Sequence, residues 1–195
     1  MITASQLIVK RAFDLILSLV LLPLLLIPIL VLIAIAAIDT KQRGLFSQIR
    51  VGQHGKLFKI FKIRTLKNKF HRLGHLEKSA TKLGQFIRNS KLDELPQIFN
   101  VIVGHMSFVG PRPDIIGFAD ELEGDDRIIL IIKPGITGPA TLKYKDEEKM
   151  LALQDDPETY NRTIIWADKV KINKNYMENW SFYLDLKYII QSIIS

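Results

Sequence analysis

Cysteine is absent from this chain of 195 residues. Its absence excludes a disulfide framework and any metal site built from thiolates. Histidine is scarce, and only His71 and His75 have helical spacing, in a stretch without strong periodicity. We therefore expect His54, His71, His75 and His105 to be solvated loop residues and not zinc ligands.

Glycine-rich motifs and internal repeats are also missing. Gly52 and Gly55 are too isolated to form a nucleotide-binding loop of the strand–helix kind. A chain of this length has room for one domain, or for a smaller domain and a membrane segment.

Basic residues outnumber acidic ones, 27 against 20, so the formal net charge is +7. This excess indicates an anionic partner such as phosphate, nucleic acid or acidic lipid. The basic stretch from Lys56 to Lys82 is compatible with anionic lipid head groups and equally with an ordinary solvated surface.

Polar residues almost disappear between Leu15 and Ile38, where only Ser18, Pro23 and Pro28 are not plainly apolar. The run is long enough to cross a hydrocarbon core and too long for a secretory signal. A buried helix of a soluble domain would show a polar face, and this run has none. Residues 1–40 are therefore predicted to be embedded in a membrane.

The residues alone leave the path of this segment open. Pro23 and Pro28 each remove an amide donor inside the helix, which favours a break. A re-entrant hairpin and a kinked spanning helix both fit. The orientation rule does not choose, because basic residues flank both ends: Lys10 and Arg11 before, Lys41 and Arg43 after.

Residues 41–195 predict a small α/β domain, mainly helical with short strands. The stretch from Gly44 to Leu66 is strand-like, and alternation over 58–63 indicates a half-buried strand. A short helix is expected near Leu83 to Arg88, and another from about Pro96 to Val103, ending at Gly104.

Proline and glycine then predict loops and turns. Residues 110–113, Gly-Pro-Arg-Pro, form neither regular helix nor central strand, so a rigid loop is expected. Turns should flank Ile136 and Thr137, and the acidic residues 146–158 should be solvated. The amphipathic helix from Ser181 is expected to dock on the core, with the membrane interface as the alternative.

Asp93 and Glu94 are the candidate reactive pair. They precede Pro96 and follow Arg88 and Lys91, an environment that binds phosphate and keeps carboxylates ionised. One ionised carboxylate can attack phosphorus, and a second can hold Mg²⁺ shared with substrate phosphates. The structural alternative is a helix cap at Asp93 and an ordinary ion pair at Glu94.

Two strings in this region resemble the core signature of the bacterial sugar transferases: Ser90–Gln97 (SKLDELPQ) and Gly104–Pro113 (GHMSFVGPRP). These are monotopic phosphoglycosyl transferases, which start surface-polysaccharide and glycoconjugate assembly. The resemblance covers nearly the whole chain in order. Supporting matches are Lys10–Asp14, Gln48–Gly52, Phe58–Leu66, Pro134–Gly138 and Asn179–Lys187.

The resemblance implies a role for each matching residue. Asp93 would be the nucleophile that takes the phospho-sugar, and Glu94 would bind Mg²⁺. Arg88 and Arg112 would hold phosphate or nucleotide. The remaining candidates are Pro111 and Pro113, which would stiffen the Arg112 loop, and Lys62 and Arg64, which would contact phosphate or lipid phosphate.

The resemblance also implies the substrates and the location. The donor would be a nucleoside diphosphate sugar, the acceptor polyprenyl phosphate, and membrane lipid a further partner, with no nucleic acid. The N-terminal segment would be a re-entrant helix hairpin under a globular domain on the cytoplasmic face of the bacterial inner membrane. No oligomeric state is implied.

The chain departs from the family pattern in three places. His105 replaces the usual aspartate, and Leu22 and Ile27 precede the prolines where a small polar residue is usual. The residues after Gly138 also differ from the more frequent run, which leaves the sugar site undefined.

One rival mechanism and one rival function remain. In a ternary mechanism Asp93 would act as a base on polyprenyl phosphate. In the non-enzymatic alternative the chain would be a membrane-anchored basic adaptor that binds anionic lipid without catalysis.

Overall fold

A computed structural model describes residues 2–67 and 79–194. The described chain is mainly helical, with two small two-stranded sheets, as the sequence predicts. His71 and His75, two of the histidines expected in loops, lie outside the described residues, as does part of the basic stretch from Lys56 to Lys82.

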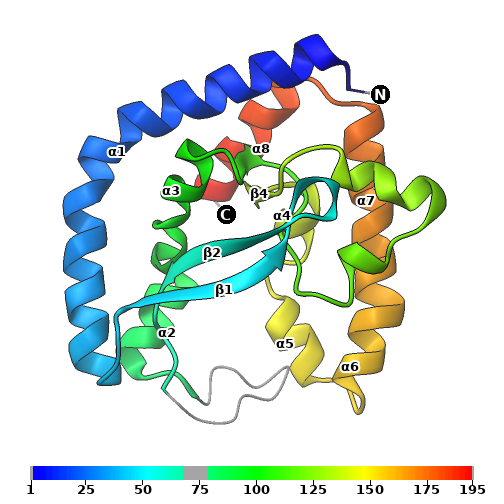
Figure 1. The fold of residues 1–195 in the computed structure, drawn as a ribbon. Helices are drawn as coiled ribbons and strands as arrows, with labels where there is room; N and C mark the ends of the chain where they lie inside the picture. Colours follow the sequence, from blue (N-terminus) through cyan, green and yellow to red (C-terminus); the bar gives the residue numbers. More distant parts are fainter. Residues whose placement is uncertain (1, 68–78, 195) are drawn as a thin grey trace.

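The N-terminal helix α1 (Ala4–Thr40) is continuous through Pro23 and Pro28, and it bends around the rest of the molecule (Figure 1). Thr3 begins it with a capping box to Gln6, and Lys41, in the left-handed conformation, ends it. Interior prolines remove donors and bend helices. We call the parts before Pro23 and after Pro28 its first and second limbs.

Helix α1 buries polar side chains and exposes apolar ones, whereas a helix in a protein core does the opposite. Its buried residues include Lys10, Asp14 and Ser18, whereas its apolar side chains mostly face outward. This helix alone among the described elements is long and apolar enough to cross a membrane. The following apolar residues are at least half exposed: Ile8, Val9, Ile16, Leu19, Val20, Leu24, Ile27, Leu30, Val31 and Ile38.

A β-hairpin follows, formed by β1 (Leu45–Val51) and β2 (Leu57–Ile63) in antiparallel register from Leu45 opposite Ile63 to Val51 opposite Leu57. The predicted strand over 58–63 is therefore confirmed. Phe58 and Ile60 are buried against Val101 and Met106. Because side chains alternate along a strand, Lys62 lies on the same inward face.

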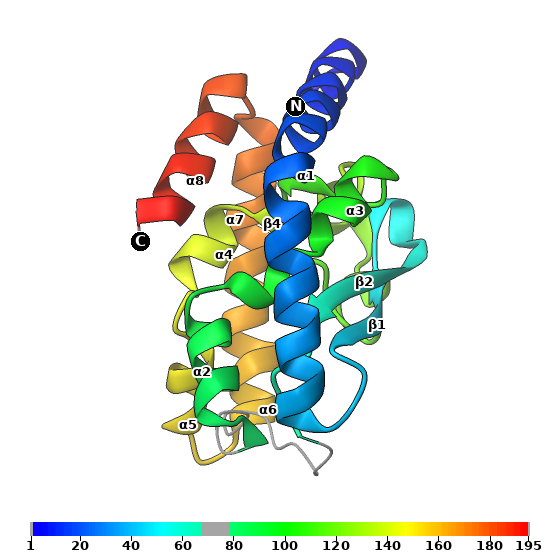
Figure 2. The same cartoon turned by 90° about the vertical axis from the view of Figure 1, so that its left-hand side faces the viewer.

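Helices α2 (Lys82–Asn89) and α3 (Gln97–Ile102) confirm the two helices predicted in this region, and both lie against α1 (Figure 2). Between them is the 3-10 turn η3 (Leu92–Glu94). Gly104 ends α3 with φ of 86°, a left-handed conformation that favours glycine.

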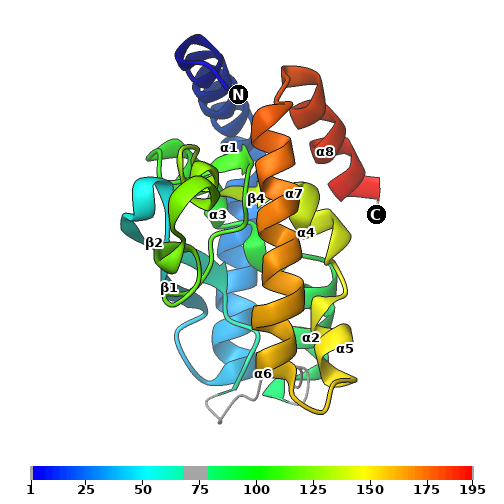
Figure 3. The ribbon, with the colours of Figure 1, turned by 90° about the vertical axis from the view of Figure 1, so that its right-hand side faces the viewer.

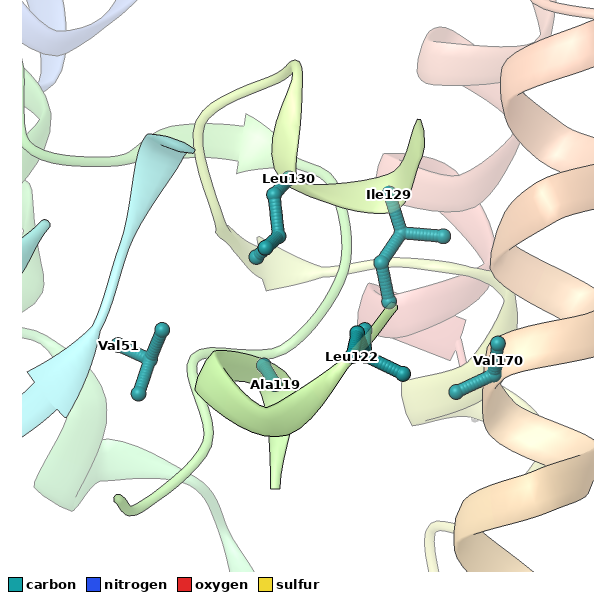
Figure 4. Packing of buried hydrophobic residues seen from close by; sticks show 6 residues of the cluster. All are labelled: Val51, Ala119, Leu122, Ile129, Leu130 and Val170. Carbon is teal, nitrogen blue, oxygen red and sulfur yellow. The ribbon is translucent and has the colours of Figure 1, made fainter. Parts of the chain in front are cut away.

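Strand β3 (Ser107–Val109) pairs in parallel with β4 (Gly135–Thr137). The backbones approach so closely that a Cβ on Gly135 would lie 2.1 Å from the amide nitrogen of Gly110. Along the chain, β3 and β4 are separated by the 3-10 segments η4 (Ala119–Glu121) and η5 (Gly124–Leu130). They form a small core with β1 and the later helix α7: Val51, Ala119, Leu122, Ile129, Leu130 and Val170 (Figure 4).

The C-terminal third is helical, and α7 runs along one side of the molecule (Figure 3). In α8, Tyr188 and Ile189 pack on the core while Ile190, Ile193 and Ile194 are more than half exposed. The expected docking is therefore confirmed for one face of α8. The elements are α4 (Pro139–Lys143), α5 (Glu147–Ala152), α6 (Pro157–Tyr160), the π-helical turn η6 (Asn161–Ile165), α7 (Trp166–Glu178) and α8 (Phe182–Ile194).

A buried polar cluster ties the first limb of α1 to α7 and α8. Lys10 Nζ donates to Asp185 Oδ2 at 2.5 Å, and the Tyr176 hydroxyl donates to Asp185 Oδ1 at 2.5 Å. All three residues are at most 4% exposed. A charge buried in this way is stable only while its partner is present.

Replacing Asp185 by alanine is expected to lower the free energy of unfolding by about 3–5 kcal/mol, because the Lys10 ammonium stays buried without a counter-charge. Thermal unfolding in detergent measures the loss. The double variant Lys10→Met, Asp185→Leu should recover most of it, because neither charge is then buried. An unchanged unfolding midpoint in Asp185→Ala would contradict the prediction.

Candidate active site

Three elements meet at one carboxylate oxygen. Glu94 Oε1 accepts a hydrogen bond from Lys62 Nζ at 2.8 Å and another from Arg112 Nη2 at 2.6 Å. Lys62 comes from β2, Glu94 from η3 and Arg112 from the loop after β3. The Glu94 side chain is 9% exposed, so both ion pairs lie in a largely dry environment.

The local backbone explains why the two acidic residues are buried together. Lys91 has φ of 58°, which ends α2 and turns the chain into η3. The Glu94 amide donates to the Lys91 carbonyl, and Leu92 packs against the second limb of α1. Neighbouring side chains in such a turn diverge by about 120°. Asp93 and Glu94 are therefore buried in different surroundings.

Asp93 lacks the partners that Glu94 has. It is 5% exposed, and no hydrogen bond from residues 2–67 or 79–194 reaches its buried Oδ1. Burial raises the pKa of Asp93 and Glu94 raises it further, against the opposing cations Lys62, Arg88 and Arg112. A buried acceptor without a partner costs about 1–3 kcal/mol, which makes this oxygen a candidate to contact a ligand.

The charges around Glu94 act in the opposite direction. Burial alone would raise the pKa of Glu94, but Arg112 and Lys62 hold it far below its ordinary value. Burial lowers the pKa of Lys62 in spite of Glu94, while Glu94 raises that of Arg112. The dyad thus contains one carboxylate locked in the ionised form and one that is easier to protonate.

Rigid backbone places Arg112 in this cluster. Pro111 and Pro113 are both buried and fix φ on either side of it. The Pro111 carbonyl accepts from the Gly135 amide at 2.8 Å, which ties the loop to β4. The predicted irregular loop is confirmed. The Arg112 side chain keeps 34% of its surface exposed, more than that of Lys62 or Glu94.

The other two predicted cations differ in position. Arg88 lies in the last turn of α2, close enough to lower the pKa of Asp93. Arg64 is engaged elsewhere: its Nε donates to the Arg43 carbonyl at 2.8 Å, and its guanidinium lies 5.2 Å from the centre of the Phe46 ring. The structure therefore joins Arg88 and Lys62 to the dyad, but gives Arg64 no contact with it.

Sequence reasoning missed three charged residues beside the Arg112 loop. Arg50 donates to the Pro113 carbonyl at 3.3 Å, and its buried Nε has no acceptor in the described chain. Burial raises the pKa of Asp114 to about 6, against the opposing cations Lys169 and Arg50. Arg50 lies inside the matching string Gln48–Gly52, and Asp114 directly follows the string Gly104–Pro113, so the sequence could have indicated both. Nothing in the sequence marked Lys169.

The donor set allows one carboxylate-bound magnesium ion. Among the described residues, no three or more acidic, histidine or cysteine side chains are placed so that they could hold a metal ion together. Mg²⁺ commonly uses one or two carboxylates with substrate phosphates and water. Asp93 Oδ1 lacks a partner, and both cations bind Oε1 of Glu94, so the second oxygen of Glu94 is not held by them. The residues therefore fit a magnesium ion that shares its ligands with a diphosphate.

A hollow of about 420 Å³ lies away from this cluster, between the first turns of α1 and the segment before β4. Leu7, Arg11, Ile132 and Lys133 are among its lining residues. Because Arg11 contacts the last turn of α3, the hollow is near the opposite end of that helix from Asp93. It is therefore separate from the carboxylate dyad.

Comparison with known proteins gives a consistent result. A family model described as bacterial sugar transferase matches residues 5–195. The uncharacterized sugar transferase EpsL of Bacillus subtilis is 34% identical over 95% of this chain and 86% of its own length. The exopolysaccharide production protein PSS of Rhizobium leguminosarum is 31% identical, covering 97% of this chain and 96% of that protein.

A third relative is longer. The UDP-glucose:undecaprenyl-phosphate glucose-1-phosphate transferase of Klebsiella pneumoniae is 32% identical over 96% of this chain. The matched region is 40% of the length of that protein.

Titration of the two carboxyl groups tests the electrostatics independently of any activity. The pKa of Asp93 should lie above its ordinary value and that of Glu94 below it, measured by carbon-13 NMR of the side-chain carboxyls. Lys62→Met should raise the pKa of Asp93 further, because a cation is lost, and Glu94→Gln should lower it, because an anion is lost. Shifts of the same sign in both variants would contradict this arrangement.

Proposed function

The chain belongs to the bacterial sugar transferase family, and from this premise we propose that it transfers a sugar-1-phosphate from a nucleoside diphosphate sugar to polyprenyl phosphate. Relatives named for UDP-glucose and undecaprenyl phosphate favour UDP as the nucleotide and undecaprenyl phosphate as the acceptor. The observation that carries the proposal is the buried, unpartnered oxygen of Asp93 beside the Glu94–Lys62–Arg112 cluster.

The proposed reaction has two displacements at one phosphorus. An Asp93 carboxylate oxygen bonds to the sugar-bearing phosphorus while the bond to the bridging oxygen breaks, and the nucleoside monophosphate leaves with that oxygen. The intermediate is an aspartyl phosphosugar. A phosphate oxygen of the polyprenyl phosphate then attacks the same phosphorus, which restores the Asp93 carboxylate and yields a polyprenyl diphosphate sugar.

The surrounding cations suit a dianionic diphosphate. Arg112 and Lys62 already face inward, and Arg88 lies on the Asp93 side. In this reaction the diphosphate competes with Glu94 for the Arg112 guanidinium, whose side chain is partly exposed. Preorganised cations in a water-poor site stabilise the charge that develops on phosphate oxygens.

Glu94 is the proposed magnesium ligand, with Asp93 at its side. When bound, the ion would offset negative charge on the diphosphate. The depressed pKa of Glu94 supports this assignment, because it keeps that group ionised at any pH where the enzyme works.

Asp93 is assigned as the nucleophile, and not as a general base, on the family resemblance of Ser90–Gln97. Either role would use the free lone pair of Oδ1, so the adduct measurement described below decides between them. The adaptor hypothesis is not favoured, because binding of anionic lipid would not require two adjacent buried carboxylates.

We also propose that α1 is re-entrant, with both ends on the cytoplasmic face of the inner membrane. The first limb contacts β3 and α8, and the second limb packs on β2 and α2 (Figures 1 and 2). One globular domain cannot lie on both sides of a bilayer, so two limbs that pack on it favour a shared side. The exposed apolar surface of α1 would face lipid.

Asp93→Asn is expected to abolish nucleoside monophosphate release, because an amide oxygen is a poor nucleophile toward phosphorus. With UDP-sugars and undecaprenyl phosphate in nanodiscs, intact-mass analysis should find a phosphosugar adduct on the unmodified enzyme and none on Asp93→Asn. Glu94→Gln should shift the magnesium dependence to higher concentration. Full turnover by Asp93→Asn would refute the covalent route, and turnover without any adduct would favour the ternary one.

Cysteine labelling tests the topology, because the natural chain contributes no thiol. The exposed position Ser5 lies in the first turn of α1, exposed Arg43 follows the end of α1, and Glu158 reports on the globular domain. In inside-out vesicles an impermeant maleimide should label Ser5→Cys, Arg43→Cys and Glu158→Cys alike. Protection of Ser5→Cys alone would mean that α1 spans the membrane.

A further inference from the structure

Polar side chains on the first limb of α1 contact the two ends of one short segment of the domain. Arg11 donates from Nη1 to the Val101 carbonyl at 2.6 Å and from Nη2 to the Ile102 carbonyl at 2.9 Å. These carbonyls belong to the last turn of α3, where a cation also stabilises the helix end. Arg11 therefore holds the far end of the helix that begins just after Asp93 and Glu94.

Asp14, one turn further along α1, holds the other end of that segment. Its Oδ1 accepts from the Ser107 hydroxyl at 3.1 Å and from the Phe108 amide at 3.0 Å. Both donors are in β3, which leads directly into the Gly110–Pro113 loop that carries Arg112. Asp14 is 2% exposed, so these bonds are shielded from water.

The second limb makes a comparable contact with α2. The Thr81 hydroxyl donates to Asp39 Oδ2 and accepts from the Gly84 amide at 2.8 Å, so the side chain that caps α2 is itself held by α1. Arg88 lies in the last turn of α2. Helix α2, which carries Arg88, and strand β3, which leads to Arg112, are thus both held by hydrogen bonds to the bent helix, α2 through its capping residue Thr81.

We propose that Asp14 and Arg11 are positioning residues, through which the membrane helix sets the distance between the Asp93–Glu94 dyad and Arg112. Neither touches the dyad in the described structure. They act through α3 and β3, the two elements that lead away from Glu94 and toward Arg112. A displacement of about 1 Å in such a frame is enough to lower a transfer rate about 100-fold. Only the rate measurement in the test below rests on the proposed function; the distance measurement does not.

The test measures geometry and rate separately. Because the chain has no cysteine, spin labels at Asn89→Cys, next to Arg88, and Ile116→Cys, beyond the Arg112 loop, report one distance. Asp14→Ala should broaden or shift that distance in nanodiscs. It should also lower kcat for nucleoside monophosphate release about 10- to 100-fold, with a smaller change in KM for the donor.

Two matched variants separate positioning from a general loss of stability. Asp14→Asn keeps an acceptor oxygen for the Phe108 amide and should restore most of the distance and the rate. Ser18→Ala removes a buried polar group on the same side of α1, but among residues 2–67 and 79–194 the Ser18 hydroxyl bonds only to the Leu15 carbonyl of its own helix. That variant should leave both readouts unchanged.

Several outcomes would overturn the proposal. They are an unchanged distance in Asp14→Ala, the same change in Ser18→Ala, or a rate loss that only parallels the loss of folded protein. If the unmodified enzyme releases no nucleoside monophosphate, the proposed function fails. The spin-label distance still decides in that case whether Asp14 positions the loop.

Discussion

The pairing of Glu94 with both Lys62 and Arg112 is the constraint on which the site depends. It joins a strand, a 3-10 turn and a loop at one oxygen atom. Buried ion pairs contribute little net stability, because desolvation offsets most of the attraction. Their retention here is better explained by what they do for a ligand. With Arg88 nearby, three cations surround two carboxylates, and the diphosphate of the proposed donor would enter a site with surplus positive charge.

The same cluster separates the behaviour of two adjacent acids. Glu94 receives both hydrogen bonds and stays ionised, whereas Asp93 receives none at Oδ1 and has a raised pKa. Two carboxylates with different environments can take different roles, one as an electrostatic anchor and one as a reactive group. The difference arises because consecutive side chains in a tight turn point in different directions.

The helix α1 connects this chemistry to the membrane. Its outward surface is apolar, and its inward surface carries Lys10, Arg11, Asp14 and Asp39, each with a partner in the domain. A helix with this distribution is stable only where lipid covers one side and protein the other. The bend at the proline-containing region lets both limbs contact the domain, so the anchor is also part of the scaffold of the site.

By itself, the sequence determined the features that depend on short-range patterns. These are the apolar N-terminal segment, the strand over 58–63, the helices on either side of Asp93–Glu94, and the rigid loop around Arg112. Local composition and backbone periodicity are sufficient for such features. The acidic pair was also evident, because its neighbours along the chain already suggested phosphate chemistry.

Only the tertiary structure decided which distant groups meet. Lys62 and Arg112 lie 32 and 18 residues from Glu94 along the chain, yet they share its oxygen, while Arg64, two residues beyond Lys62, binds elsewhere. Arg50, Asp114 and Lys169 join the neighbourhood in the same way. Such meetings depend on how strands and loops pack in three dimensions, and no local periodicity encodes the partner of a side chain so far away.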